Sequence, residues 1–370
     1  MRYQTGPETE QRMVEPTGKA VRPDPAGEPA GEEPAPRSRV HLKAALVLTL
    51  LVTVFAGALA GIYAGLMANP HPRSIPVMVV GRADTTQRVV RALDRQLDSA
   101  VEPMTHGTYR QALAHVEHGG GYAVLQSDGP GQVRLELSDA SSPSVATLLR
   151  TAAQNTVDAT GVPVHLADRH PMQTSDPQGT ALFYLTFAAT GIGFLGAGQF
   201  ASHIEGLTAT QRIGFLATSS LLGGLCIHTV AERLLGVLHM PLVLPWAVLS
   251  LAMFASAMMF TALHGLFGKW AMLPGYVLTV LVGTPSSGGS VPTALLPAPL
   301  RTLGDWLPQG AAMDGMVTSV YFPEGFPLLA LFRLTVVALV CTLLYVAAAR
   351  RSTRPAPAPG RLRGGLARAR

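Results

Sequence analysis

An uncharged stretch of 24 residues, Ala44 to Met67, is the feature that most constrains how this chain can fold. At about 1.5 Å per residue it makes a helix of roughly 36 Å, which crosses a bilayer core of about 30 Å with some tilt. Lys43 precedes it directly, and basic flanks of this kind stay in the cytoplasm. We therefore expect a membrane helix over 44–68 that runs from the inside to the outside. A cleaved signal peptide is the alternative, but its apolar run has only about 7–15 residues.

The composition indicates that this helix is one of several. The chain has 370 residues, of which 48% are hydrophobic and only 14% are charged, with a mean hydropathy of +0.29. Soluble domains carry roughly 25% charged residues. Five more apolar stretches predict further spans, over residues 180–201, 213–230, 241–263, 270–282 and 328–349. The expected fold is a polytopic α-helical membrane protein with about six transmembrane helices, the last five forming a bundle over 179–349.

The two ends of the chain are expected to be cytoplasmic tails. Residues 1–43 are rich in Pro, Glu, Gly and Ala, so they cannot bury enough apolar surface to fold. Residues 350–370 contain arginines and no acid, which fits a cytoplasmic flank that contacts membrane lipids. No aromatic platform accompanies these arginines, so nucleic acid is not an expected partner. With six spans, both ends of the chain lie on the cytoplasmic side of the plasma membrane.

Residues 69–178 predict an extracytoplasmic α/β domain between the first and second helices. Apolar alternation and short apolar runs predict strands, and apolar residues at helical spacing predict helices. The expected strands are 75–80, 122–125, 133–137 and 162–166, and the expected helices are 86–101, 109–116 and 144–157.

Few residues suggest chemistry. Gly119, Gly120 and Gly121 are not followed by Gly-Lys-Ser/Thr and do not open a helix, so they do not predict a nucleotide site. His106, His115 and His118 form either a metal cluster or a set of solvated histidines, and no cysteine joins them. Neither a catalytic triad pattern nor paired membrane carboxylates occur. We therefore expect no enzyme activity, no metal and no cofactor.

Polar and small residues in the spans suggest contacts. Gly57, Gly61 and Gly65 share one face of the first helix, where another helix can approach closely. This face packs either inside the bundle or against a second chain. His228 and Glu232 are four residues apart on the third span, where they either line a polar path or lie at the membrane interface.

The segment 283–326 is too rich in Pro and Gly for one long helix and too apolar for a plain solvated loop. We expect short interfacial or re-entrant helices that pack on the outer ends of the spans, and a disordered loop is the alternative. The residues that characterise this outer loop are Pro285, Gly288, Gly289, Pro292, Pro297 and Pro308.

Three stretches carry a resemblance to a known family: IPVMVVGRAD, GTPSSGGSVPTALLP and LPQGAAMDGMVTSVYF. Together with one helix, an outer α/β domain and five clustered helices, they resemble permeases of the type-2 ABC exporter superfamily. The branch they resemble most is the phage-infection-protein-like membrane proteins of Gram-positive bacteria. The resemblance covers roughly residues 44–349. It departs at Gly81 and Arg82, where that family often has an Asn-containing turn.

The resemblance implies a permease subunit that exports a hydrophobic or envelope-associated compound. A separate ATPase subunit would drive it, because the chain lacks a phosphate-binding GxxxxGK[ST] motif. It also implies a homodimer or heterodimer of permeases. The ATPase would dock on the loop 202–212, through Glu205, Gly206, Thr208 and Arg212, unless this loop is a plain solvent turn. A non-transporting envelope receptor or scaffold for a secretion or wall-assembly system is the alternative function.

Overall fold

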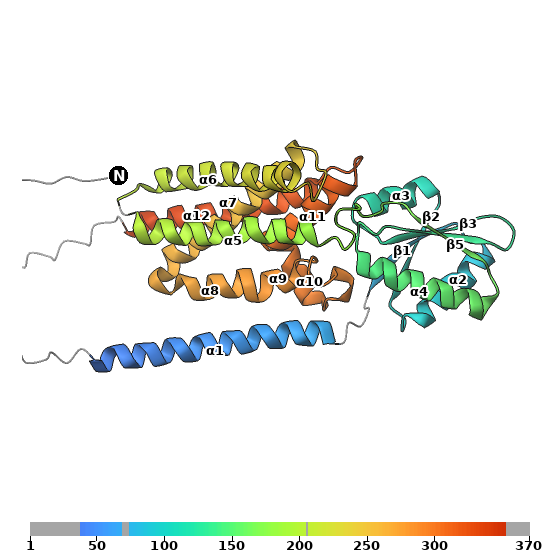
Figure 1. Cartoon of the computed structure of the whole chain (residues 1–370), viewed down its shortest axis with the longest axis horizontal. Helices are drawn as coiled ribbons and strands as arrows, with labels where there is room; N and C mark the ends of the chain where they lie inside the picture. The colour runs from blue at the N-terminus through green and yellow to red at the C-terminus, as the bar shows by residue number, and fades with distance from the viewer. Residues whose placement is uncertain (1–37, 69–73, 205, 353–370) are drawn as a thin grey trace, which may run out of the picture. The chain divides into compact units, whose positions relative to one another are not determined.

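The computed structural model describes residues 38–68, 74–204 and 206–352 (Figure 1). The chain divides into two units, Met1–Val52 and Thr53–Arg370. In the first unit, residues 38–52 form the beginning of helix α1 (Ser38–Ala68), which includes the predicted 44–68 helix. The expected tail 1–43 lies outside the described residues up to residue 37, and the tail 350–370 lies outside them from residue 353.

Residues 75–168 of the second unit form a five-stranded sheet with the order β2-β1-β3-β4-β5. β1 is parallel to both of its neighbours, β3 and β4 are antiparallel, and β4 and β5 are parallel. The strands are β1 (Ile75–Val80), β2 (Val101–His106), β3 (Ala123–Ser127), β4 (Val133–Leu137) and β5 (Val164–Asp168). Because of these directions, β1 begins at the same end of the sheet at which β5 ends.

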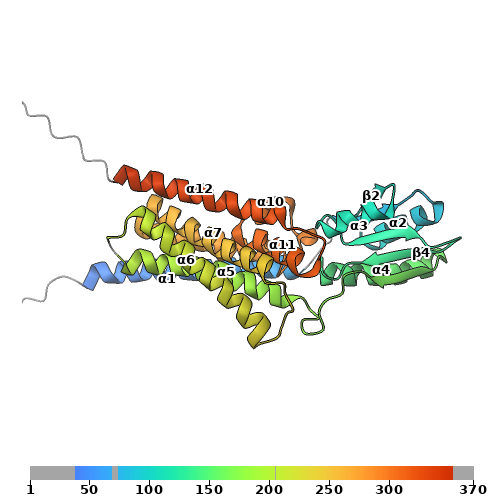
Figure 2. The same cartoon turned by 90° about the horizontal axis from the view of Figure 1, so that it is seen from above.

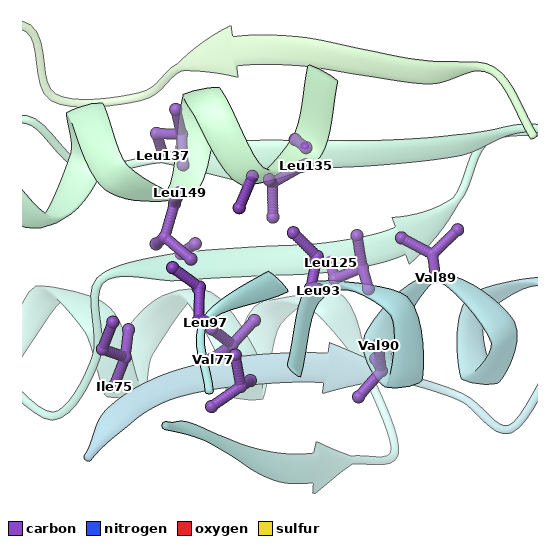
Figure 3. Packing of buried hydrophobic residues seen from close by; sticks show 14 of the residues in the cluster. Ile75, Val77, Val89, Val90, Leu93, Leu97, Leu125, Leu135, Leu137 and Leu149 are labelled. Carbon is purple, nitrogen blue, oxygen red and sulfur yellow. The ribbon is translucent and has the colours of Figure 1, made fainter. Parts of the chain in front are cut away.

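Helices cover both faces of this sheet, as Figure 1 shows. Helices α2 (Asp84–Gln96) and α4 (Pro143–Thr160) pack on one face, and α3 (Tyr109–Glu117) packs on the other. Side chains such as Leu93 and Leu149 lie between the two helices and the strands, against Leu125 (Figure 3). Alternate residues of each strand enter the core because successive side chains point to opposite faces.

The strand β2 was not predicted, and the predicted helix 86–101 is wrong at its carboxyl end. Helix α2 ends at Gln96, and Asp98 and Ser99 adopt positive φ angles of 52° and 63°, a conformation that ends a helix. The carboxylate Oδ1 of Asp94 then accepts a hydrogen bond of 3.1 Å from the backbone N–H of Val101. This bond fixes the turn that leads into β2.

Four apolar helical runs in the described residues are long enough to cross a membrane: 180–203, 209–234, 243–286 and 328–351. They contain α5 (Thr180–His203), α6 (Ala209–Thr229) with the π-helix η1 (Val230–Leu234), α7 (Val243–Phe267) and α12 (Leu328–Ser352). Helix α7 is the centre of this group, since it packs against α5, α6 and α12 (Figure 2). By length and composition, the structure supports four spans of the six predicted.

The predicted fifth span belongs to the same helical run as α7. The run turns at Gly268, whose φ is 56°, and continues through the 3₁₀ turn η2 (Gly268–Ala271) and three short pieces. These pieces are α8 (Met272–Tyr276), the π-helix η3 (Val277–Gly283) and α9 (Thr284–Ser286).

The outer loop 283–326 contains helices in the described structure. Besides α9, they are the 3₁₀ turn η4 (Thr293–Leu295), α10 (Ala298–Trp306) and α11 (Pro308–Tyr321). Helix α11 is buried along most of its length and packs against α5, α7 and α12. The loop therefore contributes a helix to the interior of the bundle.

Candidate functional site

A cavity of about 380 Å³ is lined by residues of the α/β domain and of the helical bundle. The domain contributes Tyr122 and the serines at the start of α4, and the bundle contributes residues of α10, α11 and α12. Hydroxyl groups and four charged side chains line it together with apolar residues. The charged residues are Arg301, Asp305, Asp314 and Arg333. This composition suits a ligand that has both polar and apolar parts.

Arg333 holds the charged part of the cavity together. Its guanidinium lies 3.6 Å from a carboxylate oxygen of Asp305 and 3.8 Å from one of Asp314. The Arg333 side chain is only 17% exposed, although it lies in the apolar helix α12. Burial raises the pKa of the Asp305 carboxyl group, and Arg333 counteracts part of this rise. The sequence places Arg333 near the outer end of its span, but only the structure brings it to the two aspartates.

Tyr122 connects the α/β domain to the outer loop. Its hydroxyl lies 2.9 Å from the hydroxyl of Thr293, and burial raises the pKa of Tyr122. The Nε–H of Arg301 donates to the carbonyl of Thr293 at 2.9 Å. Ring contact between His170 and Phe322, with centroids 4.6 Å apart, joins the two parts at another point. These contacts mean that movement of the domain would alter the cavity.

Three of the six predicted outer-loop residues line the cavity. They are Gly288, Gly289 and Pro292. A Cβ atom at Gly289 would lie 2.5 Å from the ring of Phe183, so only glycine fits there. Pro285 is buried in α9, Pro297 precedes α10, and Pro308 is the first residue of α11.

The helix break, by which we mean the segment 272–286 where α8 passes into the π-helix η3 and then α9, buries polar groups beside the cavity. Gln309 is 2% exposed, and its amide oxygen accepts a hydrogen bond of 3.2 Å from the hydroxyl of Thr284. The Gln309 Nε2 and Thr279 Oγ1 atoms have no hydrogen-bond partner among the described residues. Buried polar atoms are normally satisfied, so these two indicate a place for water or a ligand. Sequence analysis did not single out either residue.

The loop predicted to dock an ATPase is a short turn between α5, which ends at His203, and α6, which begins at Ala209. Thr208 forms a capping box with Gln211, so it caps α6 itself. Gly206 has a φ of 82°, and an Arg212 Nη2 donates to the carbonyl of Ile204 at 3.3 Å. Glu205 lies outside the described residues.

The glycine face of α1 has no close neighbour in the described chain. A Cβ atom at Gly57, Gly61 or Gly65 would meet no described atom within 4 Å. Tight glycine contacts occur elsewhere, since a Cβ at Gly193 of α5 would lie 2.2 Å from the carbonyl oxygen of Met253. A Cβ at Gly224 of α6 would lie 2.2 Å from Ser250 Oγ. The α1 face therefore stays a prediction for contact with a second chain, and the glycines that bring α5 and α6 close to α7 were missed.

Two further groups singled out in the sequence are the pair His228 and Glu232 and the candidate metal ligands His106, His115 and His118. The buried ring of His228 has its Nδ1 3.6 Å from a carboxylate oxygen of Glu232 and its Nε2 3.2 Å from the carbonyl oxygen of Pro241. Among the described residues, no group of three or more His, Cys, Asp or Glu side chains is arranged to hold a metal ion.

Comparison with protein-family models, curated proteins and solved structures finds no match to this chain. The functional argument therefore depends on the cavity, the helix break beside it and the charges that surround it.

Proposed function

We propose that this chain is the membrane-spanning permease subunit of an ABC-type exporter. It would move a hydrophobic or envelope-associated compound, driven by a separate ATPase subunit. The observation that carries the proposal is the cavity lined by both the α/β domain and the interrupted helices of the bundle. Transporters commonly form their substrate sites at such interruptions, where the backbone is irregular and lines a cavity.

The helix break supports transport over a purely structural role. The run 272–286 contains the π-helix η3, and π-helical segments are frequent at functional sites. It ends in Ser286, which lines the cavity, and its Thr284 contacts the buried amide of Gln309. A scaffold that binds its partner through an outer surface gains nothing from unsatisfied polar atoms inside its helices. A permease needs polar groups inside its helical bundle to bind the polar parts of its cargo.

The topology that accompanies this proposal has six spans with both termini in the cytoplasm. The four long apolar runs supply α5, α6, α7 and α12, and α1 with the run 272–286 supply the other two. The latter has 15 residues and spans about 22 Å, so it crosses the core only with help from α11. The chain then lies in the plasma membrane, with the α/β domain and the cavity on the extracytoplasmic side.

The partners in this proposal are an ATPase, a second permease chain and membrane lipids. The ATPase would contact the turn at 204–208 and the residues beside it, among them Arg212. The open glycine face of α1 is the surface that would meet the second chain, because small residues allow helices to approach closely.

Purification from native membranes in mild detergent tests this function. We expect an ATPase to co-purify with the wild-type chain and its activity to fall several-fold when Glu205 and Arg212 are both replaced by Ala. The matched control is Arg233→Ala, which removes a cation from the opposite end of the α6–η1 run. A wild-type chain that carries no ATPase would overturn the permease function.

The second candidate is an envelope receptor or scaffold that binds its ligand in the same cavity. The observation in its favour is that the α/β domain supplies part of the cavity wall, so binding need not involve transport. In that case ligand binding would respond to Arg333→Gln and would be unchanged by the double Ala variant.

A further inference from the structure

A second cleft lies on the α/β domain beside the charged cavity, since His118 lines both. It has a volume of about 550 Å³. It is lined by His106 at the end of β2, by Gln111 and His115 of α3, and by His118, which follows α3. The ring centres of His106 and His115 are 5.3 Å apart, with their planes at 47°. The Nε2 atom of His106 lies 3.1 Å from the thioether sulfur of Met78. The imidazole of His106 therefore lies next to both a second imidazole and a thioether.

The triple glycine makes room for this cluster. A Cβ atom at Gly120 would lie 2.3 Å from Cδ2 and 2.5 Å from Nε2 of His115. A Cβ atom at Gly121 would lie 2.6 Å from the methyl carbon of Met78. Both distances are too short for any side chain, so glycine at these two positions lets the His115 ring and the Met78 thioether come in. This close approach accounts for a motif that has no nucleotide-binding context.

We propose that His106, His115 and Met78 bind one Cu(I) ion. Imidazole and thioether are ligands that copper accepts, and the soft thioether selects the monovalent ion. Metal–nitrogen distances of about 2.0 Å and metal–sulfur distances of about 2.3 Å allow donors 3.1 Å apart to share an ion. Two imidazoles bound at about 2 Å have ring centres roughly 5 Å apart when their angle is near tetrahedral, close to the separation seen here.

His118 stands outside this set. Its Nδ1 lies 2.6 Å from the carbonyl oxygen of Ala114, one turn earlier on its own helix. The proposed site has three ligands, whereas the sequence led us to expect no metal. The site does not depend on the proposed transport function. His115 is exposed and His106 is half-buried, so an ion can reach them from solvent, while Met78 is fully buried beneath them.

Titration of the purified full-length chain with Cu(I) tests the site. The protein in detergent competes with a chromogenic Cu(I) chelator under anaerobic conditions. We expect the protein to bind one equivalent of Cu(I) in competition with the chelator. His115→Ala and His106→Ala should each weaken binding at least tenfold. The controls His118→Ala and His165→Ala remove histidines of the same domain outside the cluster, and we expect them to bind within twofold of the wild type.

The thioether is tested separately, because Met78 is buried and its replacement affects packing. X-ray absorption of the copper-loaded wild type should show one sulfur neighbour, which Met78→Leu should remove while the two nitrogen neighbours remain. If Met78→Leu fails to fold, the wild-type spectrum and His115→Ala, on an exposed residue, decide the question. Less than one equivalent of Cu(I) on the wild type, a spectrum without sulfur, or unchanged binding by both His→Ala variants would overturn the site.

Discussion

Gly193→Ala should separate α5 from α7. The added Cβ would lie 2.2 Å from the carbonyl oxygen of Met253 and 3.0 Å from its carbonyl carbon. Ordinary contact requires about 1 Å more, so the two backbones must move apart, and such overpacking costs typically about 1–3 kcal/mol. The hydrogen bond of 2.7 Å from Ser256 Oγ to the carbonyl of Thr190 joins the same two helices. Its loss would add about 1 kcal/mol to the cost.

Gly191→Ala is the matched control, two residues away on the same helix. A Cβ there meets no atom of the described chain within 4 Å, so the substitution adds only helix propensity, worth up to about 1 kcal/mol. The assay is the midpoint of thermal unfolding in detergent, read by fluorescence-detected size exclusion after heating. At roughly 2–4 °C per kcal/mol, Gly193→Ala should melt at least about 4 °C below Gly191→Ala. Equal midpoints would refute the close α5–α7 contact.

Three other outcomes follow from the structure and the proposed topology. In a cysteine-free background, Ser127→Cys should react in whole cells with a membrane-impermeant thiol reagent, since Ser127 is exposed on the α/β domain; labelling only after lysis would reverse the topology. Gly61→Leu should shift the chain from dimer to monomer by light scattering while insertion is retained; an unchanged mass would mean that this face meets only lipid. The raised pKa of Asp305 means that its ionised form opposes folding at neutral pH. Asp305→Asn should therefore raise stability at pH 7 by up to about 1 kcal/mol, and the gain should vanish below about pH 4; a gain at all pH values would have another cause.

The elements that sequence analysis placed well are those with an uninterrupted local signal. β1 and β4 have the predicted bounds, and α5 and α12 begin at the predicted residues 180 and 328. In each case a run of apolar residues, or a strict alternation, decides the structure by itself.

The features that it missed, the strand β2 and the bounds and burial of α11 within the segment where short helices were expected, depend on distant partners. β2 contains Glu102 and Pro103, and it forms a strand because it pairs with β1 at the edge of the sheet, where proline is tolerated. Helix α11 is made mostly of small residues without an apolar stripe, and it is helical in an interior provided by α5, α7 and α12. Neither condition can be read from the segment itself.

The candidate sites show the same limit. Arg333 is visible in the sequence as a cation inside an apolar span, but its partners Asp305 and Asp314 come from two other helices. The histidines were noticed, whereas Met78 was assigned only to a buried strand. The glycine spacing on α1 pointed to packing, but the close contacts belong to Gly193 and Gly224, because glycine spacing does not say which helix faces meet.

The strands of the sheet all come from one continuous stretch of the chain, and this has a consequence for biosynthesis. Every strand pairing of the sheet lies between residues 75 and 168, so the sheet can be completed without any residue of α5 or beyond. In this sequence 190 residues follow the first residue of α5 (370 − 180), and translating them takes roughly 10–40 s at about 5–20 residues per second. Mixed α/β domains generally fold faster than all-β domains, which take milliseconds to seconds. The domain is thus expected to be folded while the ribosome is still producing the helices against which it will pack, and those helices assemble onto a finished surface.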